Sequence, residues 1–184
     1  MNRYKLMTSL YSNLKAKHNW QPDNSIVQAN FLPILRPLAC SKGSLTAALS
    51  ALSNDDFSVN VLSQVVATPK FHEQTALNRP LSRAAMIREV ELKLSDTAVV
   101  FARSIIPLEL VCGGRNGLAN LGRTPLGHLL FKDGRIHVSK RQILHATIDG
   151  VSVSARRTPY DYQGSQILVS EYFLPTLNDY LLDR

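Results

Sequence analysis

Cysteine is scarce in this chain of 184 residues, which has only Cys40 and Cys112. Two cysteines are too few for the disulfide framework of a small secreted domain or for a zinc site made of cysteines. The chain also lacks any apolar run near the roughly 18 residues that a membrane-spanning helix needs. These absences favour a reducing compartment, so we expect a cytoplasmic protein with no integral membrane contact.

Negative charge is scarce as well, with 14 Asp and Glu against 21 Lys and Arg, and the net charge is +7. Residues 1–22 hold no acid and four of the basic residues, so only +3 remains for the rest of the chain. We therefore expect a basic N-terminal arm and irregular lead-in over 1–34 and one domain over 35–184. We expect no nucleic-acid partner, because such surfaces interleave basic with aromatic residues, and the aromatics here follow apolar strand and helix patterns.

Alternation of apolar residues predicts a sheet of about six strands. The clearest pair, 85–94 and 97–106, is expected to form a β-hairpin with Ser95 and Asp96 as its turn. Further strands are expected at 57–66, 142–148, 150–157 and 165–174. Consecutive strands with short turns and few helices indicate an α+β domain built on one antiparallel sheet.

Two short helices are expected beside this sheet. Ser44 is a suitable N-cap for a helix that begins at Leu45. Thr124 followed by Pro125 resembles an N-cap and first helical residue, which predicts a second helix there. Residues 67–82 are polar and interrupted by proline, and they predict a long loop.

Two charged residues, Arg88 and Glu171, interrupt the apolar faces of predicted strands. Burying an unpaired charge costs several kcal/mol, so each residue needs a partner or a polar cavity. One interpretation is an ion pair in the core, between the two residues or with Arg103 or Arg157. The other is a closed pocket in which a basic group binds a carboxylate and an acidic group binds a hydroxyl.

Several short segments around these residues occur in a characteristic order. They are Met86-Ile87-Arg88-Glu89, the strand end Ala102-Arg103-Ser104-Ile105-Ile106-Pro107, Gly122-Arg123-Thr124-Pro125-Leu126-Gly127, Arg156-Arg157 and Ser170-Glu171-Tyr172-Phe173-Leu174-Pro175. This ordered set resembles the chorismate lyase family, which supplies 4-hydroxybenzoate for ubiquinone synthesis in bacteria. The resemblance covers roughly residues 35–177 and leaves the basic arm outside.

The resemblance implies an enclosed pocket under helical flaps, beside an antiparallel sheet. It also implies conversion of chorismate to 4-hydroxybenzoate and pyruvate, with no cofactor and no metal. In the family, the arginine that matches Arg88 binds the ring carboxylate, and the glutamate that matches Glu171 hydrogen-bonds the ring hydroxyl. Leu126 and Leu45 match residues that line the pocket.

The chemistry also calls for a second basic group near the departing enolpyruvyl oxygen, where negative charge develops. Arg157 is the first candidate, because it shares a strand face with Val153, and Arg103 is the second. For each arginine, a core ion pair or a position at the solvated rim is an equally open interpretation.

One alternative function is a non-catalytic domain of the same fold that senses a small aromatic carboxylate. Such domains follow a DNA-binding domain in transcription regulators, and residues 1–40 are too short and too rich in proline for a helix-turn-helix. We therefore expect an enzyme, acting as a monomer, whose partners are chorismate and 4-hydroxybenzoate. No metal site is expected, because the five histidines lack the i, i+4 spacing of a helical zinc pair.

Overall fold

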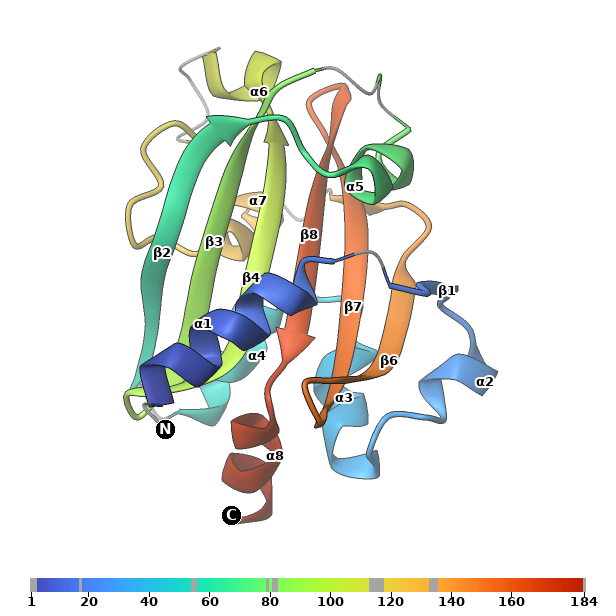
Figure 1. Ribbon diagram of the computed structural model, residues 1–184. Coiled ribbons are helices and arrows are strands. Elements are labelled where there is room, and N and C mark those ends of the chain that lie inside the picture. The colour runs from blue at the N-terminus through green and yellow to red at the C-terminus, as the bar shows by residue number, and fades with distance from the viewer. Residues whose placement is uncertain are drawn as a thin grey trace.

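The computed structural model describes residues 3–16, 18–53, 56–78, 80, 83–112, 118–132 and 136–183, with side chains from residue 9 onward. One antiparallel sheet of eight strands runs through the described chain (Figure 1). Its order is β1-β6-β7-β8-β4-β3-β2, and β5 pairs with β7 beside this path. The strands are β1 (Gln21–Pro22), β2 (Phe57–Ala67), β3 (Ala85–Leu94), β4 (Thr97–Pro107), β5 (His137–Val138), β6 (Gln142–Ile148), β7 (Val151–Tyr162) and β8 (Ser165–Phe173).

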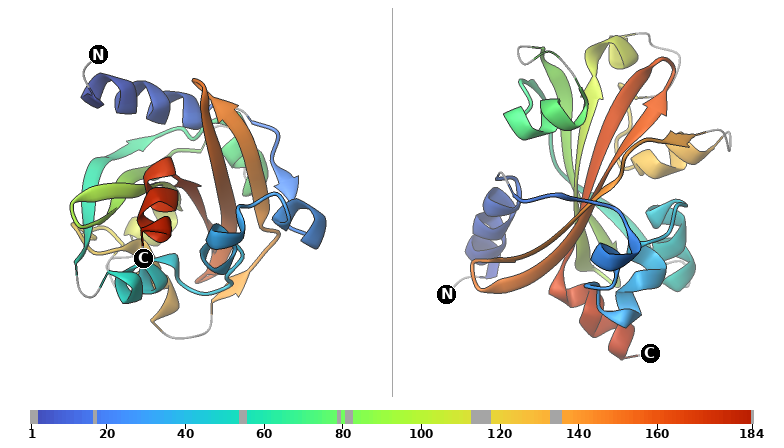
Figure 2. Two further views of the ribbon diagram at one scale, coloured as in Figure 1. Left: turned by 90° about the horizontal axis from the view of Figure 1, so that it is seen from below. Right: turned by 90° about the vertical axis from the view of Figure 1, so that its right-hand side faces the viewer.

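The helices cover both faces of the sheet (Figure 2). Helices α1 and α5 lie on one face, α3, α4 and α7 lie on the other, and α6 and α8 lie near opposite ends of the strands. No helix in the described part of the chain is long and apolar enough to cross a membrane. The helices are α1 (Arg3–Leu14), α2 (Ser25–Gln28), a 3-10 turn (Pro33–Leu35), α3 (Arg36–Ala39), α4 (Leu45–Leu52), α5 (Phe71–Ala76), α6 (Leu108–Cys112), α7 (Leu126–Phe131) and α8 (Pro175–Leu182).

The α+β class and the antiparallel sheet are confirmed, with eight strands instead of about six. The six long strands are the six that alternation predicts. The two additional strands, β1 and β5, have only two residues each, which is too short for alternation to reveal.

Tight turns explain why consecutive long strands are neighbours in the sheet. The β3–β4, β6–β7 and β7–β8 connections each have two residues between the paired strand ends. Both turn residues have positive φ in every case, as hairpin turns of type I′ require. These residues are Ser95 and Asp96 (45° and 63°), Asp149 and Gly150 (52° and 76°), and Gln163 and Gly164 (48° and 78°).

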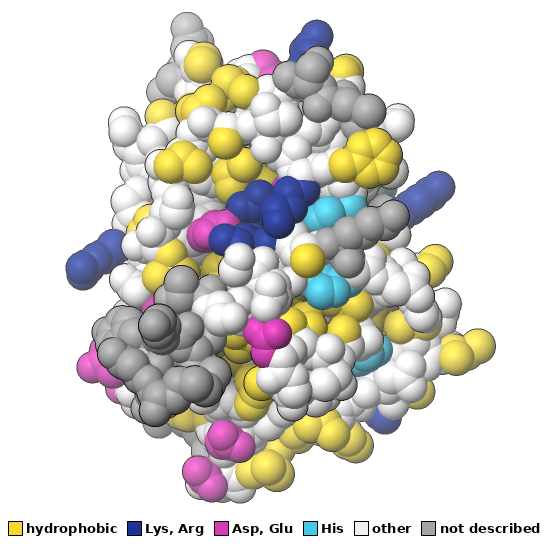
Figure 3. Space-filling model, viewed as in Figure 1, with side chains coloured by type: hydrophobic (Ala, Val, Ile, Leu, Met, Phe, Trp, Pro, Cys, Tyr) yellow, Lys and Arg dark blue, Asp and Glu magenta, His cyan; other side chains and the backbone are white. Residues whose placement is uncertain are grey.

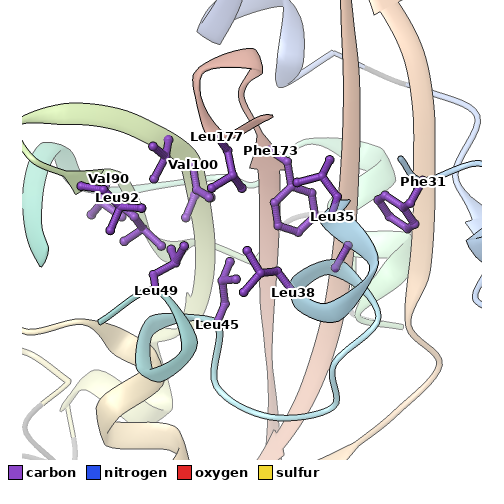
Figure 4. Packing of buried hydrophobic residues seen from close by; sticks show 14 of the residues in the cluster. Phe31, Leu35, Leu38, Leu45, Leu49, Val90, Leu92, Val100, Phe173 and Leu177 are labelled. Atoms are coloured by element: carbon purple, nitrogen blue, oxygen red, sulfur yellow. The ribbon is translucent and has the colours of Figure 1, made fainter. Parts of the chain in front are cut away.

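Helix α4 begins where the sequence predicts. The Ser44 side chain accepts a hydrogen bond from the backbone N–H of Ala47 and caps the first turn. Leu45 and Leu49 of α4 then point toward the hydrophobic residues of β3 and β4 (Figure 4). The cap therefore fixes the helix over one face of the sheet.

Helix α7 begins one residue later than predicted, because Thr124 belongs to the turn before it. The backbone N–H of Thr124 donates to Leu121 O at 2.7 Å, and its carbonyl accepts from Arg88. Pro125 takes the N-cap position with an extended backbone, and the helix starts at Leu126.

The stretch 67–82 is not entirely a loop, because it contains helix α5. Glu73 stabilises this short helix at its N-terminus by accepting a hydrogen bond from the backbone N–H of Lys70 at 2.9 Å. The same carboxylate pairs with Arg103 of the sheet. A tertiary contact of this kind leaves no signal in local hydrophobic periodicity.

Residues of the predicted N-terminal arm and lead-in contribute to the folded core. Leu14 of α1 is fully buried, and the ring of Tyr11 stacks on Phe101 of β4 with 4.4 Å between ring centroids. Phe31, after α2, packs in the hydrophobic cluster that also contains Phe173 of β8. The domain boundary between residues 34 and 35 stays a prediction, but these contacts join both sides of it.

Candidate active site

A cavity lies between the sheet and helices α4 and α7. Two of its lining residues, Arg88 and Glu171, are the charged residues that interrupt apolar strand faces. Most of the remaining lining is apolar, as in sites for small organic molecules. These remaining residues are Leu45, Thr46, Val59, Val90, Leu92, Ala102, Ser104, Pro125, Leu126, Gly127, Leu130, Phe131, Tyr160 and Val169.

Strand register brings the charged residues to this face. Arg88 of β3 pairs with Ser104 of β4, and Ala102 of β4 pairs with Glu171 of β8. Glu171 in turn pairs with Arg156 of β7. Because β4 lies between β3 and β8, the backbones that carry Arg88 and Glu171 are about 10 Å apart across the sheet.

Arg88 is a buried cation that has no carboxylate partner among the described residues. Its side chain is only 2% exposed. Nη2 donates to Gly122 O at 3.0 Å and Thr124 O at 3.2 Å, whereas Nη1 is buried and unpartnered in this part of the chain. Burial lowers the pKa of Arg88, as expected for a charge with no compensating anion. The arrangement suits an anionic ligand.

Glu171 is paired with Arg156 and not with the three arginines considered from the sequence. Arg156 Nε donates to Glu171 Oε2 at 2.5 Å, and the arginine is 1% exposed. Burial alone would lower the pKa of Arg156, but the charge and hydrogen bond of Glu171 raise it above its ordinary value. Glu171 Oε1 has no hydrogen bond within the described ranges, so it can accept one from a ligand.

Arg103 lies on the opposite face of the sheet and does not line the cavity. Its Nε is 2.7 Å from Glu73 Oε1, and its Nη1 is 2.5 Å from Glu89 Oε1. Two carboxylates satisfy this cation, so it forms the core ion pair that the sequence left open. Burial lowers the pKa of Arg103, but Glu73 and then Glu89 reverse that effect and raise it.

Arg157 shares that opposite face, because it is one residue away from Arg156 on a strand whose side chains alternate. Its Nε donates to Gln142 Oε1 at 2.7 Å, and its guanidinium lies 4.7 Å from the ring centroid of Trp20. Burial lowers the pKa of Arg157 to about 10. The geometry therefore does not support Arg157 as the second basic group of the cavity.

Basic side chains and histidines also gather near the middle of this second face (Figure 3). On the same face as Arg157, His72 of α5 has its ring Nδ1 3.3 Å from Arg157 Nη1. Burial lowers the pKa of His72, which favours the neutral ring that such an acceptor requires. Polar clusters thus occupy both faces, but only the α4/α7 face has the cavity that contains Arg88 and Glu171.

Three residues of the cavity face went unassigned in the sequence: Ser104, Arg156 and Tyr160. Tyr160 lines the cavity, and burial followed by the nearby Glu171 charge raises its pKa to about 12. Its phenol is therefore protonated at neutral pH and can donate a hydrogen bond. Alternation along β7 places Arg156 and Tyr160 on one face, and this signal could have found both residues.

The helices that cover the cavity each contribute a leucine to its wall. Leu45 from α4 and Leu126 from α7 both line the cavity. The two helices meet closely at Gly127, where an added Cβ would lie 3.1 Å from Ser44 Oγ and 3.2 Å from Thr46 Oγ1. A glycine here lets α4 and α7 close over the sheet together.

Solved structures share the fold at low sequence identity. The effector domain of PhnF from Mycobacterium smegmatis superposes with a TM-score of 0.55 at 11% identity, covering 75% of this chain and 92% of that one. A gene product of Staphylococcus aureus gives a TM-score of 0.51 at 10% identity, covering 73% and 90%. At such identities the likeness concerns the fold alone.

Sequence relatives are much closer. The probable chorismate pyruvate-lyase of Methylococcus capsulatus is 34% identical over 148 residues, covering 74% of this chain and 91% of that protein. The protein of the same name from Alcanivorax borkumensis is 35% identical over 162 residues, covering 86% and 76%. The family model described as chorismate lyase matches residues 14–181. The chain belongs to the chorismate lyase family.

Proposed function

We propose that this protein converts chorismate to 4-hydroxybenzoate and pyruvate in the cavity between the sheet and helices α4 and α7. The observation that carries the proposal is Arg88, which lines a mostly apolar cavity and whose buried Nη1 has no hydrogen-bond partner among the described residues. Chorismate supplies the ring carboxylate that such a cation lacks. Membership of the chorismate lyase family supports this substrate.

The two polar ends of the cavity suit the two ends of the substrate ring. Arg88 at one end donates to the ring carboxylate, and Glu171 Oε1 at the other accepts a hydrogen bond from the ring hydroxyl. Leu45 and Leu126 cover the ring between them, and their packing excludes water. Arg88 and Glu171 thereby fix the orientation of the ring within the cavity.

The reaction needs little from the protein beyond orientation and charge stabilisation. The bond between the ring carbon and the enolpyruvyl oxygen breaks, and the neighbouring ring carbon, which bears the hydroxyl, loses its hydrogen. The three-carbon fragment gains one hydrogen and leaves as pyruvate, so atoms balance without water or an oxidant. Aromatisation makes the step strongly downhill, and for this reason we propose that the enzyme uses no metal and no redox cofactor.

Negative charge that develops on the departing oxygen requires a nearby donor. Arg103 and Arg157, the two candidates from the sequence, lie across the sheet from the cavity. Tyr160 lines the cavity, and its protonated phenol is the donor that we propose for this role. We also propose that the protein acts as a monomer in the cytoplasm, with small molecules as its partners.

The experiment is incubation of the purified full chain, dialysed against a chelator, with chorismate. We expect equimolar pyruvate, measured with lactate dehydrogenase, and 4-hydroxybenzoate, measured by chromatography. Tight binding of 4-hydroxybenzoate without any pyruvate release would contradict the proposal and indicate a sensing domain instead.

A further inference from the structure

We propose that Arg156 is a positioning residue that sets the preference of the cavity for a ring with a hydroxyl opposite its carboxylate. It acts through Glu171: by holding Oε2 it leaves Oε1 as the acceptor that faces the ligand. This inference rests on the proposed function, because it concerns the same cavity. It assigns a role to a residue that does not itself line that cavity.

The contact between the two side chains is single and directional. Nε of Arg156 donates to Oε2 of Glu171 at 2.5 Å, and within the described chain the glutamate makes no other side-chain hydrogen bond. Both groups are buried, with exposures of 1% for the arginine and 7% for the glutamate. A carboxylate in such surroundings is held by its one cation, and a rotation that broke the contact would leave two buried charges unpaired.

The guanidinium is itself prevented from moving. Nη1 of Arg156 donates to three backbone carbonyls, those of Leu38 at 3.1 Å, Ala39 at 3.2 Å and Ser41 at 2.8 Å. Leu38 and Ala39 are the last residues of α3, and Ser41 belongs to the connection from α3 to α4, which begins at Leu45. Arg156 therefore connects the acceptor for the ligand hydroxyl to the backbone that leads into the cavity wall.

Arg141 is a natural control for this arrangement. Its Nη1 donates to Ser41 O at 2.6 Å and its Nη2 to Cys40 O at 3.0 Å, so it holds the same backbone segment. Its carboxylate partner is Asp23 at 2.6 Å from Nε, and not Glu171. Loss of Arg141 should disturb the segment before α4 without freeing the carboxylate in the cavity.

Lysine cannot replace Arg156 in this role, although it keeps the charge. The guanidinium uses two separate nitrogens at fixed angles for the carboxylate and the carbonyls, and one ammonium group cannot reproduce that geometry. In Arg156→Lys the Glu171 carboxylate is free to reorient. A ligand with a ring hydroxyl should then lose affinity, whereas benzoate, which has none, should not.

The test is calorimetric binding of 4-hydroxybenzoate and of benzoate to the full-length chain and its variants. The preference is the ratio of the affinity for 4-hydroxybenzoate to the affinity for benzoate. We expect Arg156→Lys to reduce this ratio about tenfold, which corresponds to the free energy of one hydrogen bond to a charged group. Arg141→Lys should leave this ratio unchanged. Glu171→Gln should reduce the ratio as well, and adding Arg156→Met to it should change the ratio no further, because Arg156 acts only through the glutamate.

An unchanged ratio in Arg156→Lys would overturn the proposal, as would an equal loss of preference in Arg141→Lys, which would show a merely structural effect. If Arg156→Lys does not fold, the Arg156→Met/Glu171→Gln pair decides, since a further loss of preference beyond Glu171→Gln alone contradicts the proposal. Pyruvate release from chorismate by the unaltered protein distinguishes failure of the proposed lyase activity from failure of the proposed role of Arg156. Its absence would refute the proposed function, whereas the ratio tests Arg156.

Discussion

At the scale of single residues, three buried arginines differ in what neutralises them. Arg103 has the carboxylates of Glu73 and Glu89, and Arg156 has that of Glu171. Within the described ranges, the hydrogen-bond acceptors of Arg88 are two backbone carbonyls. Carbonyl dipoles offset part of the cost of burying a cation, but a full negative charge offsets more. Arg157 also lacks a carboxylate partner among the described residues, but Arg88 combines this lack with a place in the cavity lining, and this combination is the residue-scale mark of the proposed binding site.

Replacing Arg88 by methionine should separate binding from stability. The variant loses the group that holds the ring carboxylate, so the affinity for 4-hydroxybenzoate should fall by about 100-fold. Its free energy of unfolding should stay within about 1 kcal/mol of the unaltered protein, because an uncompensated buried charge is removed along with its hydrogen bonds. Calorimetry and urea unfolding measure the two quantities.

Arg103→Met provides the contrast, since it leaves two carboxylates near the sheet without their cation. It should lower the free energy of unfolding by about 3–5 kcal/mol. A larger loss of stability in Arg88→Met than in Arg103→Met would contradict the distinction between a binding cation and a structural one.

At the scale of elements, alternation predicted the long strands but not which face of the sheet holds the cavity. The sequence places Arg157 on one face with Val153, and the structure agrees with that grouping. Alternation of apolar and polar residues shows which side chains of one strand share a face, but not which face of the sheet that is. The faces of β3 and β7 are related through β4 and β8, so the register of four strands had to be known before Arg156 could be chosen over Arg157.

Helix α5, a short element stabilised by tertiary contacts, was not predicted. Helix α5 depends on a carboxylate whose cation lies 30 residues away in the chain. Of the residues that line the cavity from α4 and α7, only Leu45 and Leu126 were expected there, and that expectation came from the family resemblance. Local signals thus predicted the helices that carry Leu45 and Leu126, whereas only long-range geometry located Glu73.

The close approach of α4 and α7 at Gly127 gives a prediction at this scale. In Gly127→Ala the new Cβ would lie 3.1 Å from Ser44 Oγ, so the two flap helices must separate by a few tenths of an ångström. Release of 4-hydroxybenzoate should accelerate about tenfold, as stopped-flow dissociation would show. Gly43→Ala is the matched control, because its Cβ meets Ser41 Oγ at an ordinary 3.5 Å. Equal release rates in both variants would contradict this account of flap closure.

At the scale of the whole molecule, one sheet separates two polar clusters with different tasks. The cavity face carries Arg88 and Glu171, which we propose bind the ligand, whereas on the α1/α5 face Glu73 and Glu89 neutralise Arg103. The four basic residues among residues 1–22 predicted a basic N-terminal arm, and in the structure α1 of this arm lies over the sheet and packs Leu14 into the core (Figure 1). Overall charge therefore did not reveal where the functional cation lies.

Stability of the whole protein should decline in acid through Glu73. Burial by itself raises the pKa of this carboxyl, but Arg103 reverses the effect and holds it below the ordinary 4.5. A depressed pKa in the folded state contributes stability that is present above pH 4.5 and is lost as the pH falls through the folded-state pKa. Urea unfolding from pH 7 to pH 3 should show this decline, and Glu73→Gln should make it shallower. If the free energy of unfolding fell equally steeply with pH in the unaltered protein and in Glu73→Gln, the proposed contribution of Glu73 would be contradicted.

The measurement that tests the central claim most directly is the rate of pyruvate release from chorismate by the unaltered protein and by Arg88→Met. The account predicts stoichiometric pyruvate and 4-hydroxybenzoate from the former, and a loss of about 100-fold or more in kcat/KM for the latter in a folded protein. Comparable rates in the two proteins would show that the cavity around Arg88 is not the site of the reaction.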